Sequence, residues 1–214
     1  MISAKTGYLW DIVKYVEGII VTINNMQPIY LVTSNISKYQ EIKKALQKHD
    51  IKVKRINIDI PEIKSLNSEA VVTDKAFKAF KIVKKPVFVD DTGIFFKGYK
   101  DFPGMLSRFI FLTLGYTGIF KLIVNNHPAY FKSSVAYMDS NLKNPSVFTG
   151  FCHGKLIKKI KGARRQRMPY DNFFIPAGEK KTFAQLGIEG KQKHDHRSKA
   201  VNKLAKYLIQ NKKS

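Results

Sequence analysis

Cysteine and long apolar runs are nearly absent from this sequence. Cys152 is the single cysteine among 214 residues, so an intramolecular disulfide cannot form. A lone cysteine is typical of a reducing compartment, and we expect a cytoplasmic protein. No stretch of about 18 or more uncharged apolar residues occurs, so the sequence predicts no membrane-spanning helix.

Acidic residues are also scarce. The chain has 38 Lys and Arg against 16 Asp and Glu, which gives a net charge of +22. This excess indicates an anionic partner, either a nucleotide polyphosphate or a nucleic acid, or else a lysine-rich surface without a specific partner. The hydrophobic content of 44% is that of a packed globular domain and excludes wholesale disorder.

Short apolar runs alternate with helical patterns, which predicts an α/β domain. Two later segments with period-two alternation flank residues 141–145 and predict an antiparallel pair, so the sheet is expected to be mixed. In the helix predicted over 70–83, we expect Ala76, Phe77, Phe80 and Val83 to point inward. The predicted strands are 29–32, 53–60, 87–89, 134–138 and 147–153, and the predicted helices follow residue 35, span 70–83 and span 196–210.

The two ends of the chain differ from this domain. Residues 1–27 show apolar positions at near-helical spacing, and their mixed charges argue against a cleaved signal peptide. We predict a helical N-terminal extension that packs on the domain or on a partner. The domain itself is predicted over 28–210, followed by a basic tail at 211–214. The segment 155–167 carries basic residues and no acid, and is predicted to be an exposed loop.

The stretch Thr-Ser-Asn-Ile-Ser-Lys at 33–38 follows a predicted buried strand and opens a helix. Such a turn exposes backbone N–H groups at the positive end of the helix dipole, where phosphate binds. Lys38 lies one turn into the helix, where its ammonium group could reach a bound phosphate. Helix capping by Asn35 or Ser37 explains the same residues without a ligand.

Val-Asp-Asp-Thr-Gly at 89–93 places two acids at the predicted carboxyl end of a strand, where open α/β sheets bind ligands. Because side chains alternate along a strand, only one of Asp90 and Asp91 is expected to face a site squarely. Carboxylates suit Mg²⁺, which retains water ligands and bridges phosphates. Glu62 and Glu69 are candidates for a second metal ligand, and each could instead be a surface acid.

The stretch Asp-His-Arg-Ser at 195–198 begins the last predicted helix. Asp195 could be the N-cap of this helix. His196 and Arg197 could bind phosphate or a purine, or could be surface residues. Tyr170 and Asp171 form a further short polar and aromatic pair in the same half of the chain.

Several short motifs follow one another in order between residues 28 and 208: TSNISKYQE at 33–41, IPE at 60–62, DDTG at 90–93, PGMLSR at 103–108, YD at 170–171, KTFAQL at 181–186 and KQKHDHR at 191–197. This ordered set resembles the inosine triphosphate pyrophosphatase, or Ham1-like, family. The corresponding family patterns are T-G-N-x-x-K-x-x-E, L-P-E, D-D-S-G or E-D-T-G, P-G-x-x-S-R, an aromatic-Asp pair, K-T-x-A-E-L and K-x-x-x-S-H-R.

The resemblance implies an elongated α/β fold in which two lobes flank a nucleotide cleft around a central twisted mixed sheet, usually as a homodimer. It implies Mg²⁺-dependent hydrolysis of ITP, dITP or XTP to the monophosphate and pyrophosphate. By position, Glu62 and Asp91 would hold Mg²⁺, and Asp91 and Lys38 would be catalytic. The substrate-binding residues it implies are Thr33, Ser34, Asn35, Ile36, Ser37, Lys38, Lys75, Thr92, Met168, Pro169, Tyr170, Asp171, Lys191, His196 and Arg197.

The chain departs from the family pattern at three places. Ser34 replaces a glycine in the first motif, and Asp195 replaces serine in S-H-R. Residues 167–172, RMPYDN, stand where the family has G-F-G-Y-D-P, so Met168 replaces the aromatic residue and Pro169 removes a backbone donor. Base selectivity is therefore the property most open to change. The alternatives are a pyrophosphatase for another modified nucleotide and, less favoured, a nucleic-acid-binding protein that uses the basic surface.

Overall fold

The computed structural model describes residues 27–63, 65–100, 102–165 and 167–211. The predicted extension, apart from residue 27, and residues 212–214 of the predicted tail lie outside the described residues. Within the described part of the chain, no helix is both long and apolar enough to cross a membrane.

One mixed sheet runs through the described residues in the strand order β2-β1-β3-β5-β6-β7, and β4 pairs with β3 beside this path. β1 pairs in parallel with β2 and β3, and the other pairs are antiparallel, so the prediction of a mixed sheet is confirmed. The strands are β1 (Ile29–Val32), β2 (Val53–Ile56), β3 (Val87–Phe96), β4 (Pro103–Gly104), β5 (His127–Met138), β6 (Ser146–Leu156) and β7 (Phe174–Pro176).

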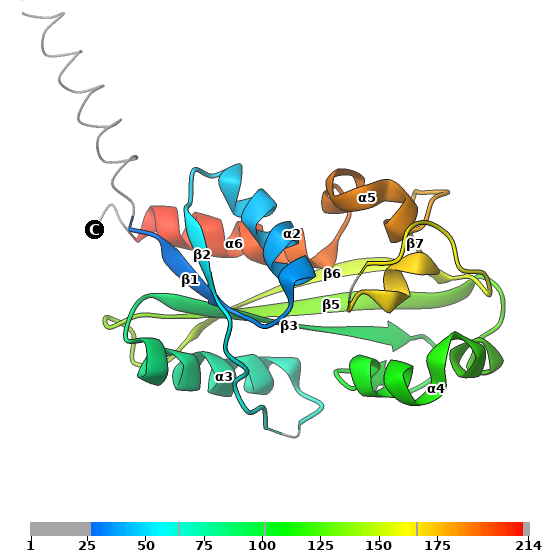
Figure 1. Cartoon of the computed structure of the whole chain (residues 1–214), viewed down its shortest axis with the longest axis horizontal. Helices are drawn as coiled ribbons and strands as arrows, with labels where there is room; N and C mark the ends of the chain where they lie inside the picture. The colour runs from blue at the N-terminus through cyan, green and yellow to red at the C-terminus, as the bar shows by residue number, and fades with distance from the viewer. Residues whose placement is uncertain (1–26, 64, 101, 166, 212–214) are drawn as a thin grey trace, which may run out of the picture.

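Helices cover both faces of this sheet, and the molecule is elongated along β5 and β6 (Figure 1). α2 and α6 pack together on one face, and α3 packs on the opposite face against β3 and β5. α5 lies on the same side as α6, and α4 lies on the side of α3 (Figure 1). The helices are α2 (Ile36–Gln47), α3 (Ser68–Val83), α4 (Ser107–Leu122), η1 (Pro169–Asn172, a 3₁₀ helix), α5 (Phe183–Gln192) and α6 (His196–Gln210).

Three apolar clusters form the core. Two of them lie on opposite faces of the sheet at the β1 end, under α2 with α6 and under α3. The third joins the far ends of β3, β5 and β6 to η1, β7, α4 and the start of α5. The polar residues of the predicted motifs lie between these apolar clusters, so the sheet carries the site at its middle.

The structure corrects four predictions of local structure. β2 ends at Ile56 rather than residue 60, and β3 continues through Asp90 and Asp91 to Phe96 because all of residues 87–96 pair with β5. Phe77 is 38% exposed, with Lys81 Nζ 4.5 Å from its ring centroid, so it does not point inward. The segment 155–167 begins as part of β6 and contains the buried residue Ile157, so it is not simply an exposed loop.

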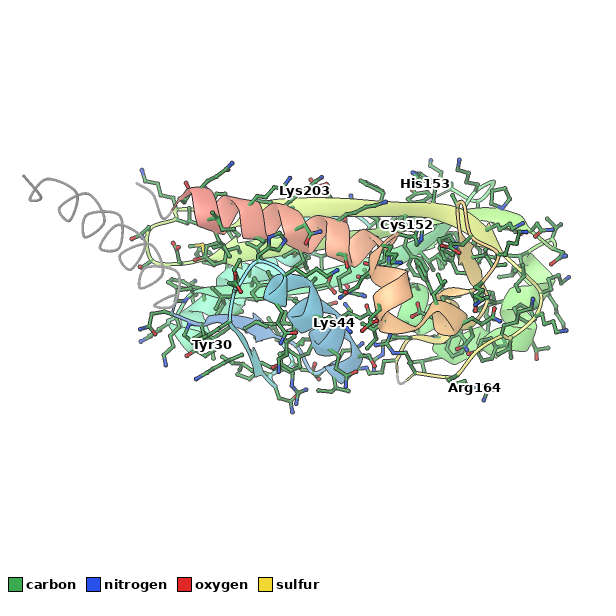
Figure 2. All side chains as sticks on the ribbon, turned by 90° about the horizontal axis from the view of Figure 1, so that it is seen from above. Tyr30, Lys44, Cys152, His153, Arg164 and Lys203 are labelled. Carbon is green, nitrogen blue, oxygen red and sulfur yellow. The ribbon has the colours of Figure 1, made fainter. Side chains whose placement is uncertain are left out.

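Lysines of α6 lie along the edge of β6. β7 pairs only with Gly154–Leu156, so the earlier part of β6 has no further strand beside it within the described residues. Lys199 Nζ donates to Phe151 O at 2.9 Å, and Lys203 Nζ donates to Thr149 O at 2.7 Å. Figure 2 looks onto α6 and labels Lys203. Charged side chains on an exposed edge oppose pairing with another chain, which gives part of the lysine excess a structural role.

α6 approaches the sheet closely at Gly150. A Cβ atom added to Gly150 would lie 2.1 Å from His196 O and 2.7 Å from Ala200 N. Both contacts are with backbone atoms, so relief of the clash requires a shift of β6 or of the helix that carries His196 and Arg197.

We predict that Gly150→Ala lowers the free energy of unfolding by about 1–3 kcal/mol, because overpacking forces backbone movement. Thermal unfolding would show this as a fall in Tm of roughly 2–4 °C per kcal/mol. Gly190→Ala in α5 is the control, because its nearest contact is with the Leu186 side chain at 3.1 Å. The control is expected to change stability by less than about 1 kcal/mol. Equal Tm values for Gly150→Ala and the unmodified protein would contradict the close packing.

Candidate active site

A cavity of about 550 Å³ opens at the middle of the sheet. Its wall comes from the turn between β1 and α2, from β3, from the start of α4, from the loop before η1, from η1 itself and from the start of α6. Distant segments of the sequence therefore meet in one place. The predicted site residues that line it are Thr33, Ser34, Asn35, Lys38, Glu62, Lys75, Asp91, Thr92, Met168, Pro169, Tyr170, Asp171 and Arg197.

The turn after β1 is shaped by its own side chains. Asn35 is the N-cap of α2, and its Oδ1 accepts from Ser37 N at 3.0 Å and from Lys38 N at 3.3 Å. Thr33 Oγ1 accepts from Asn35 N at 3.1 Å. Capping therefore occupies several of the amides that we expected to bind phosphate. Ile36 and Ser37, although predicted to bind substrate, do not line the cavity.

The carboxylate of Asp90 is held by ion pairs and a hydrogen bond within the protein. Lys38 Nζ lies 3.0 Å from its Oδ2, Arg197 Nε lies 3.2 Å from the same oxygen, and Ser133 Oγ donates to its Oδ1. Burial opposes ionisation, but Lys38 and Arg197 outweigh it and hold the pKa of Asp90 well below its usual range. Asp90 is therefore a carboxylate whose charge is balanced inside the protein.

Asp91 has a different environment. It follows Asp90 in a regular strand, so its side chain leaves the opposite face of the sheet. Burial raises the pKa of Asp91, and the charge of Glu62 raises it further, against the effect of Lys38, whose Nζ lies 3.9 Å away. Thr92 N donates to Asp91 Oδ1 at 2.8 Å. Both acids line the cavity, but Asp91 is the one with incompletely balanced charge.

The structure separates the two candidates for a second metal ligand. Glu62 lines the cavity and forms an ion pair with Lys75, which lines it as well. Glu69 Oε1 accepts from Lys132 at 3.2 Å and does not line the cavity. Of the two alternatives, only Glu62 shares the cavity with Asp91.

Asp91 and Glu62 suit a cation that keeps most of its water ligands better than a cation whose ligands all come from protein side chains. Among the residues that the structure describes, no group of three or more His, Cys, Asp or Glu side chains could hold a metal ion. A pair of carboxylates is nevertheless the usual protein contribution to Mg²⁺, whose remaining ligands are waters and phosphates. The charge of Glu62 raises the pKa of Asp91, and a cation shared by the two would relieve this repulsion.

A buried ionic network supports the wall behind the cavity. Lys191 Nζ lies 3.0 Å from Glu41 Oε1 and 2.7 Å from Asp171 Oδ2. Arg197 Nη1 donates to Glu41 Oε2, and Arg165 Nη1 donates to Glu41 Oε1. Burial opposes ionisation of Glu41, but the three cations outweigh it and hold its pKa far below the usual range.

Glu41 was not among the predicted site residues. The available signal was its place as the last residue of the first motif, in the second turn of α2. A carboxylate in the second turn of a helix is usually a solvated residue, and its partners come from segments more than 100 residues away.

His196 and Lys191 do not line the cavity, although both were predicted to bind substrate. His196 is buried and its ring stacks on Phe131, with centroids 4.6 Å apart and an interplanar angle of 10°. Within the described residues, neither ring nitrogen has a hydrogen-bond partner. Burial and the nearby Arg197 lower the pKa of His196 well below its usual value, so the ring is neutral.

Asp195 caps α6 and accepts from Ser198 N at 2.6 Å, as predicted for an N-cap.

One end of the cavity is apolar and aromatic. Phe111 and Tyr116 are in edge contact with centroids 4.9 Å apart, and Met168 and Pro169 complete this part of the wall. Tyr170 OH donates to Ser107 O at 2.8 Å, which ties η1 to the start of α4. This end suits a flat ring, and the opposite end, at Lys38, suits an anion.

The loop before η1 contributes arginines that we did not predict. Arg164, labelled in Figure 2, lies over the Tyr116 ring, with its Cζ 5.5 Å from the ring centroid. Arg165 forms an ion pair with Glu41. Arg167 Nη1 donates to Ser34 Oγ at 2.9 Å. All three line the cavity. The basic segment that we predicted as an exposed loop therefore forms part of the site.

Known proteins resemble this chain over most of its length. A family model described as Ham1 family matches residues 29–207. The chain is 36% identical to a dITP/XTP pyrophosphatase of Methanopyrus kandleri over 86% of this chain and 97% of that protein. It is 37% identical to a dITP/XTP pyrophosphatase of Hyperthermus butylicus, covering 85% and 95%. A HAM1 protein from Coxiella burnetii has a similar fold, with a TM-score of 0.71 and 22% identity over 86% of this chain and 100% of that chain.

We predict that Glu41→Gln lowers the free energy of unfolding by about 3–5 kcal/mol, because it leaves buried cations without their carboxylate. Urea unfolding at neutral pH measures the change. Glu189→Gln is the control, since Glu189 pairs with Lys44 at the surface and is expected to show no measurable effect. A loss below about 1 kcal/mol for Glu41→Gln would contradict the role given to the network.

The same pair of proteins gives a pH test. The folded-state pKa of Glu41 is depressed, so its contribution is present above its unfolded pKa of roughly 4.3 and is lost as the pH falls below that value. The stability gap between the unmodified protein and Glu41→Gln should therefore stay constant from about pH 7 to pH 5 and narrow as the pH falls from about 4.3 toward 3. A gap that stays constant between about pH 4.3 and pH 3 would show that ionised Glu41 is not its source.

Proposed function

The chain belongs to the Ham1 family, and we propose that it hydrolyses non-canonical purine nucleoside triphosphates, dITP, ITP and XTP, to the monophosphate and pyrophosphate. The observation that carries this proposal is the polarity of the cavity, with Lys38 and two carboxylates at one end and an aromatic slot at the other. The relatives named dITP/XTP pyrophosphatases support the choice of substrate class.

The phosphate end would be formed by the turn after β1. Thr33, Ser34 and Asn35 line the cavity there, and Lys38 provides a cation beside them. Lys38 is shared between Asp90 and Asp91, so it would also keep Asp91 oriented as a triphosphate enters. Lys75 lies close to the same phosphates in this proposal and is held by Glu62.

Asp91 and Glu62 would hold Mg²⁺, which would supply charge neutralisation for the phosphate oxygens. Asp91 is also the candidate for orienting and deprotonating the attacking water. Burial raises its pKa, so it is a stronger base than an exposed aspartate. Thr92 N fixes one of its oxygens, which leaves the other for water.

The base would occupy the slot between η1 and α4. Arg197 lines the cavity, and its guanidinium group donates to Asp90, Glu41 and Thr92 there. Its remaining N–H groups would be the donors to the base. A 6-oxo purine offers an acceptor to such a donor, whereas adenine offers an amino group. An unsatisfied donor costs about 1–3 kcal/mol, which corresponds to roughly ten- to a hundredfold discrimination.

The altered wall at Met168 and Pro169 favours a second candidate, a pyrophosphatase for another modified nucleotide. Met168 is 8% exposed and fills the place of an aromatic residue in the family pattern. A flexible thioether tolerates more than one shape of ring. The chemistry at the phosphate end is the same in both candidates, so they differ only in the base that is accepted.

We further propose that residues 28–210 form the catalytic domain and that it works as a homodimer in the cytoplasm. Exposed apolar side chains near and within α4 support a second copy as partner, since Phe109 is 63% exposed and Leu112 is 72% exposed. The basic surface leaves nucleic acid as a further, unfavoured partner.

We predict rapid pyrophosphate release from dITP and XTP with Mg²⁺, and release from ATP at least tenfold slower. Asp91→Asn should reduce the rate by about a hundredfold or more, because the base and a metal ligand are lost together. Glu69→Gln is the matched control, because this acid pairs with Lys132 outside the cavity and should leave the rate unchanged. Equal rates for the Asp91→Asn variant and the unmodified enzyme would refute the assignment, and equal rates with all substrates would show a loosened base slot.

A second prediction concerns the metal. Glu62→Gln should raise the Mg²⁺ concentration needed for half-maximal rate by roughly tenfold or more, with activity partly recovered at high Mg²⁺. Rates are measured across a Mg²⁺ titration, again beside Glu69→Gln. If Glu62→Gln and Glu69→Gln gave the same titration curve, Glu62 would not be a metal ligand.

A further inference from the structure

Two departures from the family pattern touch each other across the cavity. Ser34 stands in the phosphate turn where the family has glycine, and Arg167 stands before η1 where the family also has glycine. Arg167 Nη1 donates to Ser34 Oγ at 2.9 Å, although the two are 133 residues apart in sequence. Both residues line the cavity, so this contact joins its two walls beside the turn.

The backbone at Arg167 keeps a conformation that suits glycine. Its φ is 59°, in the left-handed region where a Cβ atom is unfavourable. A glycine at this position would be free of that strain. Residues held in such a conformation concentrate at functional sites, where the side chain provides something that offsets the strain.

The charge of Arg167 is not neutralised by an ion pair among the described residues, unlike the charges of Arg165 and Arg197. Arg165 and Arg197 both form ion pairs with Glu41, and Arg197 also pairs with Asp90. Arg167 is exposed, and in the described part of the chain it has a neutral hydroxyl as its partner and no carboxylate within ion-pair distance. A guanidinium group at a cavity wall with no counter-ion is suited to an anionic ligand.

The turn that Arg167 faces needs such a donor. Asn35 Oδ1 occupies the amides of Ser37 and Lys38, so they are not free to bind phosphate. Lys38 is shared between Asp90 and Asp91. The cations and amides expected to bind phosphate are therefore partly engaged within the protein.

We propose that Arg167 binds the triphosphate chain of the substrate and that Ser34 positions its guanidinium group for this contact. This inference rests on the proposed function and adds a phosphate ligand to it. On substrate binding, Arg167 turns from the Ser34 hydroxyl to phosphate oxygens, or keeps Nη1 on Ser34 and donates with its other N–H groups.

The test compares Arg167→Gly with Lys84→Gly. Lys84 is a matched control, because it is also a basic residue with positive φ, 52°, and it ends α3 outside the cavity. Steady-state kinetics with dITP give KM and kcat, and inorganic tripolyphosphate serves as a competitive inhibitor that lacks base and sugar. Arg167→Gly should raise KM and the inhibition constant together by about tenfold or more, with kcat within about threefold.

Two further variants separate binding from positioning. Arg167→Lys should recover part of the affinity, because it keeps the charge but not the planar fork. Ser34→Gly should raise KM by less than Arg167→Gly, and the double variant should resemble Arg167→Gly alone, since Ser34 acts through Arg167. Additive effects would show that Ser34 does not act through Arg167.

The outcomes also separate this inference from the proposed function. The phosphate contact would be overturned if KM and the inhibition constant for Arg167→Gly lay within twofold of the values for Lys84→Gly. A fall in kcat with no change in KM would overturn it as well. Neither result would contradict the proposed pyrophosphatase activity. If the unmodified protein hydrolysed none of the nucleotides, the proposed function would fail. Calorimetric titration with tripolyphosphate would then still decide whether Arg167 binds phosphate.

Discussion

The site depends on one buried guanidinium group. Arg197, at the start of α6, bonds to Asp90 on β3 and to Glu41 on α2, and it is almost completely buried. Burying such a charge is costly unless it is paired and hydrogen-bonded, so the three elements must stay together for the cost to be met. Lys191 extends the same network to Asp171 on η1, so it reaches both the phosphate end and the base end of the cavity.

The alternation of side chains on β3 separates the acid that belongs to this network from the acid proposed to be catalytic. Asp90 points toward Arg197 and is held ionised by it, while Asp91 points to the other face and keeps a raised pKa. Lys38 bridges them, with its Nζ 3.0 Å from Asp90 and 3.9 Å from Asp91. Two adjacent acids can thus have different tasks because a strand places them in different electrostatic surroundings.

Local patterns predicted part of the fold and missed α4, α5, β4 and β7, and long-range contacts explain several of the differences. β1, α6 and the antiparallel pair β5 and β6 follow from periodicity, and the N-cap at Asn35 follows from residue type. The length of β3 could not be foreseen, because Asp-Asp-Thr-Gly is a turn-like sequence that becomes a strand only by pairing with β5. The same holds for the site. Motif residues such as Lys38 and Asp91 were identifiable, but Glu41 and Arg167 acquire their roles from partners far away in the sequence.

The central claim is that the cavity holds a triphosphate with its α–β anhydride bond beside Asp91. The most direct measurement is ³¹P NMR of the products of dITP turnover with Mg²⁺. The account predicts resonances of the nucleoside monophosphate and inorganic pyrophosphate, in equal amounts and from the first time point. Nucleoside diphosphate and orthophosphate would contradict it, because the reacting bond would then lie at the wrong end of the phosphate chain.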